Sequence, residues 1–230
     1  VMMSAPYTGA PDIKTDLFIE DPIHHNLENL PTPKKHYQWY YSTPEANNDM
    51  HLEQKELHKF LRAYYHMKSA DWLDNNPYEL GSWTAENLAK MPEYYIMKSN
   101  ENMVQAVMPH FPKNRDFDNW LSDEELDVYA SSFFKNSFQP ALNWYRCMTS
   151  PIQNNDLKIF SNKKIEVPSC FIAGEKDWGI FQKPGALEKM ENNLCINYCG
   201  RHILKNAGHW VQQENPNDVL KTLLDFYKNK

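Results

Sequence analysis

Two residues in the last quarter of the sequence have the types and the spacing needed for acid–base chemistry. Asp177 and His209 lie 32 residues apart, and each follows a short apolar run that predicts a strand. A carboxylate beside an imidazole holds one ring nitrogen and leaves the other free to act as a base. Glu175 is a rival carboxylate, although we expect it to form a salt bridge instead. The pair of loops therefore indicates general base catalysis by His209, oriented by Asp177.

These side chains can meet only if the elements around them form a parallel sheet. Residues 168–174 predict a buried strand, residues 183–192 a helix and residues 201–204 a second strand. A final helix begins at Pro216 and is capped by Asn215. Its predicted apolar face consists of Val219, Leu220, Leu223, Leu224 and Tyr227. This alternation predicts a parallel α/β unit, in which active groups lie beyond the carboxyl ends of the strands.

The middle of the chain has a different character, because it is aromatic and helical. Apolar residues at helical spacing predict a helix within Met50–Met67, and a second helix is expected over Gln139–Met148. Ser122 and Glu125 form a capping-box pattern at the start of another helix. The predicted division is therefore a core strand over residues 1–15, a helical lid over 16–152 and a C-terminal core over 153–230.

The opening residues, Val1–Pro6, are mostly apolar and predict a buried strand that starts at the first position. Chain ends are usually loose and polar. We therefore expect a longer polypeptide in which another segment precedes Val1.

Composition excludes several classes of function. The net charge of −6 gives no expectation of nucleic acid binding, and the short basic run Lys34–His36 is interpreted as solvated lid surface. No apolar run reaches the roughly 18 residues that a membrane span needs. Cys195, Cys199 and His202 supply too few ligands for zinc, so neither a metal nor another cofactor is expected. Four scattered cysteines are typical of reduced thiols, which favours a cytoplasmic protein.

Five segments resemble α/β-hydrolases, and most closely their epoxide hydrolase and haloalkane dehalogenase branch. Gly174–Asp177 and Ala207–Pro216 resemble the acid and histidine loops of that family. Phe138–Arg146 contains Asn-Trp-Tyr-Arg, as the lid helix of epoxide hydrolases does, with Pro-Ala where relatives usually have a glycine-containing pair. His36–Tyr40 resembles the earlier lid segment, and Val1–Pro6 resembles the strand before the lid. The similarity is nearest to fungal members and implies part of the α/β-hydrolase fold: the last three parallel strands, their flanking helices and an inserted, mostly helical lid.

The resemblance also implies a reaction and the residues that perform it. Tyr37 and Tyr145 would donate hydrogen bonds and a proton to the leaving oxygen of a small apolar epoxide, while Asp177 and His209 would activate water. We therefore expect the hydroxyl groups of Tyr37 and Tyr145 to face the side chains of Asp177 and His209. The indole rings of Trp39, Trp144 and Trp210 would line the substrate pocket, although aromatic packing explains them equally well.

The sequence lacks the sharp, glycine-flanked turn that carries the nucleophile in this fold. No two of its seven glycines are four residues apart. By resemblance, that turn lies upstream of the position of Val1, so we expect this stretch alone to be inactive. The sequence leaves open an esterase or a haloalkane dehalogenase on the same scaffold, a non-catalytic truncated interaction protein, and a homodimer.

Overall fold

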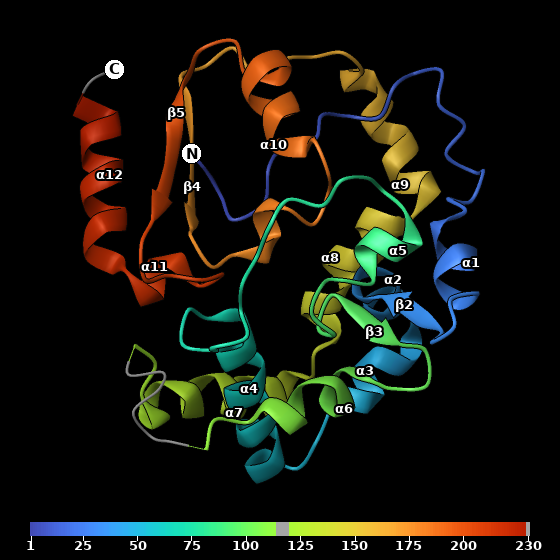
Figure 1. Cartoon of the computed structure of the whole chain (residues 1–230), viewed down its shortest axis with the longest axis vertical. Helices are drawn as coiled ribbons and strands as arrows, with labels where there is room; N and C mark the ends of the chain where they lie inside the picture. The colour runs from blue at the N-terminus through green and yellow to red at the C-terminus, as the bar shows by residue number, and fades with distance from the viewer. Residues whose placement is uncertain (114–119, 229–230) are drawn as a thin grey trace. The chain divides into compact units, whose positions relative to one another are not determined.

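A computed structural model of the chain describes residues 1–113 and 120–228 (Figure 1). These residues form two units. The first unit contains residues 1–13, 68–82 and 158–230, and the second contains residues 14–67 and 83–157. The division expected from the sequence placed residues 68–82 in the lid, whereas the structure groups them with the first unit. No described helix is both long enough and apolar enough to cross a membrane.

The first unit is built on a parallel sheet of three strands, in the order β1-β4-β5. Its elements are β1 (Met2–Met3), β4 (Ser169–Gly174), α10 (Ala186–Lys189), β5 (Tyr198–Leu204), α11 (Val211–Glu214) and α12 (Pro216–Lys228). Short helical turns lie at Leu157–Phe160, Trp178–Ile180 and Met190–Leu194. The three predicted strands and their parallel order are therefore confirmed, but the first strand begins at Met2 and is half-buried, whereas a buried strand from Val1 was predicted.

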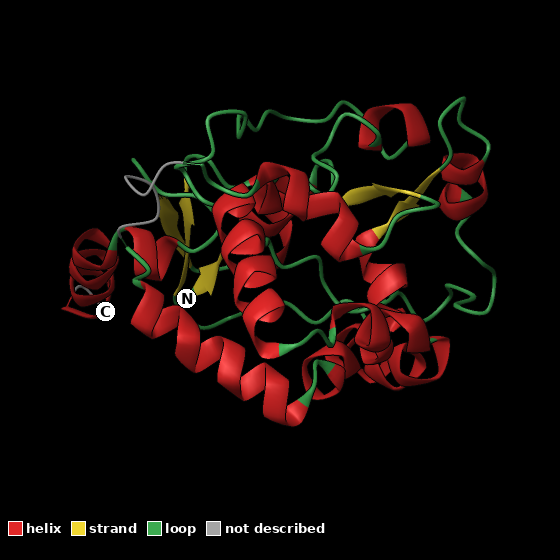
Figure 2. Cartoon of the chain, turned by 90° about the horizontal axis from the view of Figure 1, so that it is seen from below, coloured by secondary structure: helices red, strands yellow, loops and turns green. Residues whose placement is uncertain are grey.

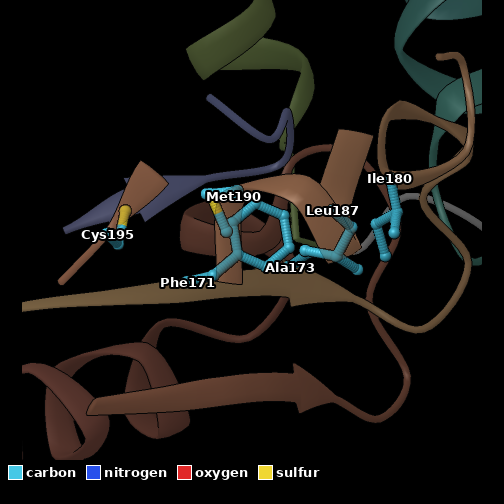
Figure 3. Packing of buried hydrophobic residues seen from close by; sticks show 6 residues of the cluster. All are labelled: Phe171, Ala173, Ile180, Leu187, Met190 and Cys195. Carbon is cyan, nitrogen blue, oxygen red and sulfur yellow. The ribbon is translucent and has the colours of Figure 1, made fainter. Parts of the chain in front are cut away.

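Both faces of β4 are buried, which explains why its sequence is an uninterrupted apolar run. Phe171 and Ala173 pack against a cluster that includes Leu187 and Met190, on the side of α10 (Figure 3). Ile172 points to the opposite face of the sheet. It packs there with Ala207 in the loop after β5, Val211 of α11 and Val219 of α12. Figure 1 shows α10 and α12 on either side of the sheet. Full burial of a side chain as large as Phe171 contributes roughly 1.5–3 kcal/mol, so β4 fixes the position of the loop that follows it.

Two further sequence-based details of this unit were wrong. Strand β5 begins at Tyr198, three residues before the predicted start, because an edge strand alternates exposed and half-buried residues and carries no continuous apolar run. The helix predicted over residues 183–192 is α-helical only over Ala186–Lys189, after Gly185 adopts a left-handed backbone with φ 72°. Only Val219 and Leu223 of the α12 face pack on the core. The rest of that face is largely exposed: Leu220, Leu224 and Tyr227.

The second unit is mostly helical, with one two-stranded antiparallel ribbon (Figure 2). Its helices are α1 (Ile23–Glu28), α2 (Tyr37–Ser42), α3 (Pro44–Met50), α4 (Gln54–Lys68), α5 (Ala85–Leu88), α6 (Met103–Val107), α7 (Asp123–Asn136), α8 (Gln139–Thr149) and α9 (Pro151–Asp156). A single turn of 3₁₀ helix covers Met108–His110. The ribbon pairs β2 (Lys34–His36) with β3 (Ile96–Lys98). The predicted capping box at the start of α7 is present in full, with reciprocal bonds between Ser122 and Glu125.

The basic run Lys34–His36 was wrongly interpreted as solvated surface. It forms strand β2, where His36 is buried and both lysines are half-buried. The lysine ammonium groups donate to backbone carbonyls of Ile96 and Ser99 across the ribbon. Long lysine side chains can cover apolar surface while the charged end finds acceptors, which a charge pattern alone does not reveal.

Candidate active site

The structure brings Asp177 and His209 together at the carboxyl end of two adjacent parallel strands. Asp177 follows β4, His209 follows β5, and the Asp177 Oδ1 atom lies 3.0 Å from His209 Nδ1. Asp177 is buried at 1% exposure, whereas the His209 side chain is 26% exposed. Since an ionised carboxylate can only accept, Nδ1 carries the hydrogen and Nε2 is left as an acceptor. This is the arrangement that a general base requires.

The Asp177 side chain is fixed by the turn that it begins. Its Oδ1 atom also accepts a hydrogen bond of 2.7 Å from the backbone N–H of Gly179. A Cβ atom at Gly179 would lie 2.8 Å from that oxygen and 2.9 Å from the carbonyl oxygen of Ser4, so only glycine fits without a shift. Asp177 Oδ2 is buried, and none of the described residues donates to it. One carboxylate oxygen thus holds both the turn and the imidazole.

The backbone of His209 is held on both sides. Its N–H donates to the carbonyl of Lys68 at 2.8 Å, and its carbonyl accepts from the hydroxyl of Ser4 at 3.2 Å. The imidazole contacts Trp210 edge to face, with the ring centroids 4.9 Å apart. Lys68 and Ser4 belong to two distant stretches of sequence, so the position of the His209 backbone depends on the tertiary fold of the first unit.

Two glycines allow the loops of the site to approach each other closely. A Cβ atom at Gly174 would lie 2.3 Å from the carbonyl oxygens of Ala207 and Gly208. A Cβ atom at Gly208 would lie 2.4 Å from the carbonyl oxygen of Lys68. Every one of these neighbours is backbone, which cannot move aside as a flexible side chain can. Glycine at both positions is therefore a geometric requirement of the pair formed by Asp177 and His209, which we call the dyad.

Residues 68–76, which we call the bracket, were missed by sequence analysis and support both loops of the dyad. The buried Asn75 amide donates to the carbonyls of Ser69 (2.7 Å) and Lys176 (2.8 Å), the second of which precedes Asp177. The Lys176 ammonium donates to Asn76 at 2.8 Å. The only signal in the sequence is the turn-forming Asn-Asn-Pro at positions 75–77, which predicts a break without indicating what it packs against.

Glu175, the rival carboxylate, is directed elsewhere. It is exposed, and its Oε1 atom accepts a hydrogen bond of 2.8 Å from the backbone N–H of Asn206. Within residues 1–113 and 120–228, Glu175 makes this loop contact and not the salt bridge that we expected. Asp177 is the carboxylate that reaches His209.

In the second unit, Tyr37 and Tyr145 lie against each other on α2 and α8. Their ring centroids are 5.8 Å apart at an interplanar angle of 74°. Tyr41 contacts both rings, at 5.7 Å and 4.9 Å, and burial raises the pKa of its hydroxyl. Pro140 occupies the first turn of α8, where proline is tolerated, so the unusual Pro-Ala pair does not interrupt the helix that carries Tyr145.

The side chain of Gln38 donates to the Tyr37 hydroxyl oxygen at 3.2 Å, so this oxygen acts as an acceptor in that contact.

A neutral histidine positions Tyr37 at the start of α2. Burial lowers the pKa of His36 to about 3, so its ring carries no charge at neutral pH. The His36 Nδ1 atom accepts from the backbone N–H of Gln38 at 3.3 Å and caps the helix. The imidazole also stacks on the Tyr37 ring, with 5.2 Å between centroids.

The three tryptophans expected around a substrate have different environments. Trp39 packs against His24 with ring centroids 3.9 Å apart, and Trp210 contacts His209. Trp144 is 73% exposed. Their role as a pocket wall remains a prediction.

Comparison with known proteins places these features in a family context. No family model matches the chain. Epoxide hydrolase B of Mycobacterium tuberculosis is 32% identical over 107 residues, which are 46% of this chain and 29% of that protein. Epoxide hydrolase A of the same organism is 36% identical over 111 residues, or 46% of this chain and 32% of that protein. Among solved structures, an epoxide hydrolase from an endophytic Streptomyces superimposes with a TM-score of 0.73 at 22% identity, covering 98% of this chain and 59% of that one.

The chain is similar to the C-terminal portion of an epoxide hydrolase. Potato epoxide hydrolase I gives the same result, with a TM-score of 0.64 over 99% of this chain and 61% of that one. The predicted α/β-hydrolase fold, partial and with a helical lid, is thereby confirmed. The epoxide hydrolase-like chain spans about 60% of the solved structures and matches about a third of the curated relatives.

Proposed function

We propose that this chain is the part of an epoxide hydrolase that supplies the general base and the proton donors. The observation that carries the proposal is the 3.0 Å contact between Asp177 and His209, at the ends of neighbouring strands, in a chain similar to epoxide hydrolases. The substrate class is a small apolar epoxide, and the product is a diol.

The first step would be opening of the ring. A carboxylate oxygen attacks one ring carbon, the bond between that carbon and the ring oxygen breaks, and its electron pair stays on the oxygen. An alkoxide is a poor leaving group, so a proton donor must meet it as charge develops. Tyr37 and Tyr145 are the proposed donors, and their adjacent rings in the second unit support this assignment. Removing one such donor typically slows the chemical step by about 10²–10³-fold.

The second step would be hydrolysis of the ester. His209 Nε2 takes a proton from water, and the resulting hydroxide attacks the ester carbonyl carbon. The diol leaves and the carboxylate is restored, while Asp177 stabilises the imidazolium that forms in between. The proton then returns from His209 to the tyrosinate through solvent.

The attacking carboxylate is proposed to lie outside this stretch of sequence. The chain has no pair of glycines four residues apart, which the usual nucleophile turn requires, and it spans only part of its relatives. A polypeptide limited to residues 1–230 is therefore expected to show no epoxide turnover, and measured diol formation by it would refute this part of the proposal.

The full-length polypeptide tests the mechanism with an aryl epoxide as substrate and intact-protein mass spectrometry. We expect His209→Gln to accumulate an ester, seen as a mass increase equal to one substrate molecule. Tyr145→Phe should lose most diol formation, whereas the matched control Tyr227→Phe, at an exposed tyrosine of α12, should not. Unchanged turnover in Tyr145→Phe would overturn the assignment. Ester or haloalkane hydrolysis that is independent of both lid tyrosines would assign a different reaction to the same scaffold.

A further inference from the structure

Glu214 is the last residue of α11, and its side chain folds back over the residues that flank His209. Its Oε2 atom accepts a hydrogen bond of 2.9 Å from the backbone N–H of Gly208. Its Oε1 atom accepts one of 3.0 Å from the backbone N–H of Trp210. One carboxylate therefore holds the residue before the imidazole and the residue after it.

A third hydrogen bond ties this carboxylate to the bracket. The Oε2 atom also accepts from the backbone N–H of Ala70 at 2.7 Å. Two residues earlier in the bracket, the carbonyl of Lys68 accepts from His209 N–H at 2.8 Å. The bracket therefore accepts a hydrogen bond from the His209 loop at Lys68 and donates one at Ala70, and Glu214 supplies the acceptor of the second bond.

Only a carboxylate satisfies this set of donors. The three N–H groups approach from two segments and need two acceptor oxygens, both of which glutamate provides. A glutamine has one acceptor oxygen, and its NH₂ group would face donors. An aspartate keeps both acceptor oxygens but is shorter by one methylene, so from the same backbone position it would satisfy only part of this set of donors.

We propose that Glu214 is a positioning residue that holds the His209 loop in the geometry at which the imidazole meets Asp177. The contacts stand independently of any reaction. The catalytic consequence rests on the proposed function, because His209 acts there only in ester hydrolysis. Glu214 is therefore expected to support that step and not the opening of the epoxide.

The charge of Glu214 is sensitive to its surroundings. Burial raises its pKa to about 7, the carboxylate of Asp71 acts in the same direction, and the three backbone N–H groups oppose the shift. The other titratable groups on the bracket and the His209 loop are the Lys68 ammonium, which lies 5.8 Å from the Trp210 ring centre, the Asp74 carboxylate and the His209 imidazole. Glu214 is thus expected to titrate near neutral pH, and the three backbone N–H groups that donate to it should respond to its change of charge.

The first experiment follows backbone amide resonances of the full-length protein by NMR as pH is varied. We expect the amide protons of Ala70, Gly208 and Trp210 to shift together with one common midpoint. In Glu214→Gln the common shift should vanish, and the control Glu188→Gln, at an exposed residue of α10, should retain it. Independent behaviour of the three amides in the unsubstituted protein, which needs no variant to fold, would overturn the proposed clamp.

The second experiment measures ester formation and ester hydrolysis separately in the full-length enzyme. A displacement of the imidazole by about 1 Å can cost up to roughly 10²-fold, so we expect hydrolysis to slow by about 10- to 100-fold in Glu214→Gln while ester formation is unchanged. Glu214→Asp, which keeps the charge, should recover part of the loss. Equal slowing of both steps would assign Glu214 a general stabilising role and refute the positioning role. If the unsubstituted enzyme forms no ester, the proposed reaction fails, and the amide titration alone decides whether Glu214 holds the loop.

Discussion

Replacement of Gly208 by alanine is the most direct test of how the dyad is positioned. An added Cβ atom would lie 2.4 Å from the carbonyl oxygen of Lys68, and 2.7 Å and 2.8 Å from the carbonyl carbon and Cα of Ser69. All three neighbours are backbone atoms, so the His209 loop or the bracket must move. The same Lys68 carbonyl accepts the N–H of His209, and any movement that relieves the clash weakens that bond.

The expected loss of stability has two parts. Forcing an extra carbon into a packed site typically costs about 1–3 kcal/mol. Weakening one buried hydrogen bond adds about 1 kcal/mol. A total of about 2–4 kcal/mol corresponds to a fall in Tm of roughly 5–15 °C for a chain of this size.

Thermal unfolding and hydrogen exchange at the His209 amide measure the two parts. We expect Gly208→Ala to lower Tm and to remove exchange protection of the His209 amide. Gly185→Ala is the matched control, because its added Cβ meets no atom within 4 Å although φ is 72°. It should cost about 1–2 kcal/mol through backbone strain and leave His209 protected. A Gly208→Ala protein with unchanged Tm and full protection at His209 would show that the close approach of the two backbones does not hold the dyad.

Three further substitutions or conditions test other parts of the structure. Ser122→Ala removes the hydroxyl that accepts from Glu125 N–H, and it should lower the free energy of unfolding, measured by chemical denaturation, by about 1 kcal/mol. An unchanged free energy of unfolding would argue against the capping box. Asn75→Ala leaves carbonyls such as that of Lys176 without their donor, and we expect a loss of about 2–3 kcal/mol together with faster amide exchange around Asp177. The pKa of Glu214 is raised by folding from its ordinary value of 4.5 to about 7, so folding favours its protonated form. That contribution to the free energy of unfolding is present below about pH 4.5 and is lost as pH rises through about 7. The loss between pH 5 and pH 8 amounts to at most about 3 kcal/mol. Glu214→Gln should flatten this part of the dependence of unfolding free energy on pH, and an unchanged dependence would contradict the raised pKa.

The strands of the first unit and the dyad could be predicted because their signals are local. The apolar run of β4 is buried on both faces, and each dyad residue stands a few positions after a strand. Parallel order then places both side chains at one edge without any knowledge of distant contacts. The capping box of Ser122 and Glu125 was predictable for the same reason, since all of its atoms lie within four residues.

The bracket could not be predicted because its role is entirely non-local. Asn75 donates to the carbonyl of Lys176, 101 positions later in the chain, and Ala70 donates to Glu214, 144 positions later. Backbone carbonyls and N–H groups are present at every position, so no residue type marks the ones that are used. Strand β2 was missed for a related reason, since burial of His36 depends on pairing with Ile96, sixty positions away.

The glycines connect these two kinds of information. In the sequence, Gly174 and Gly208 were noted only as members of the two loop motifs, and no close approach was predicted at either of them or at Gly179. A Cβ atom added at any of the three would lie under 3 Å from backbone or carboxylate atoms of the site. A catalytic pair can be held by side chains, which tolerate small changes, or by backbone in close contact, which does not. Here the backbone N–H of Gly179 binds the Asp177 carboxylate and the backbone carbonyl of Lys68 binds the N–H of His209, while two side chains, Glu214 and Ser4, hold the backbone around His209. The geometry of the dyad should therefore respond more strongly to added methyl groups at these glycines than to changes in the apolar side chains around it.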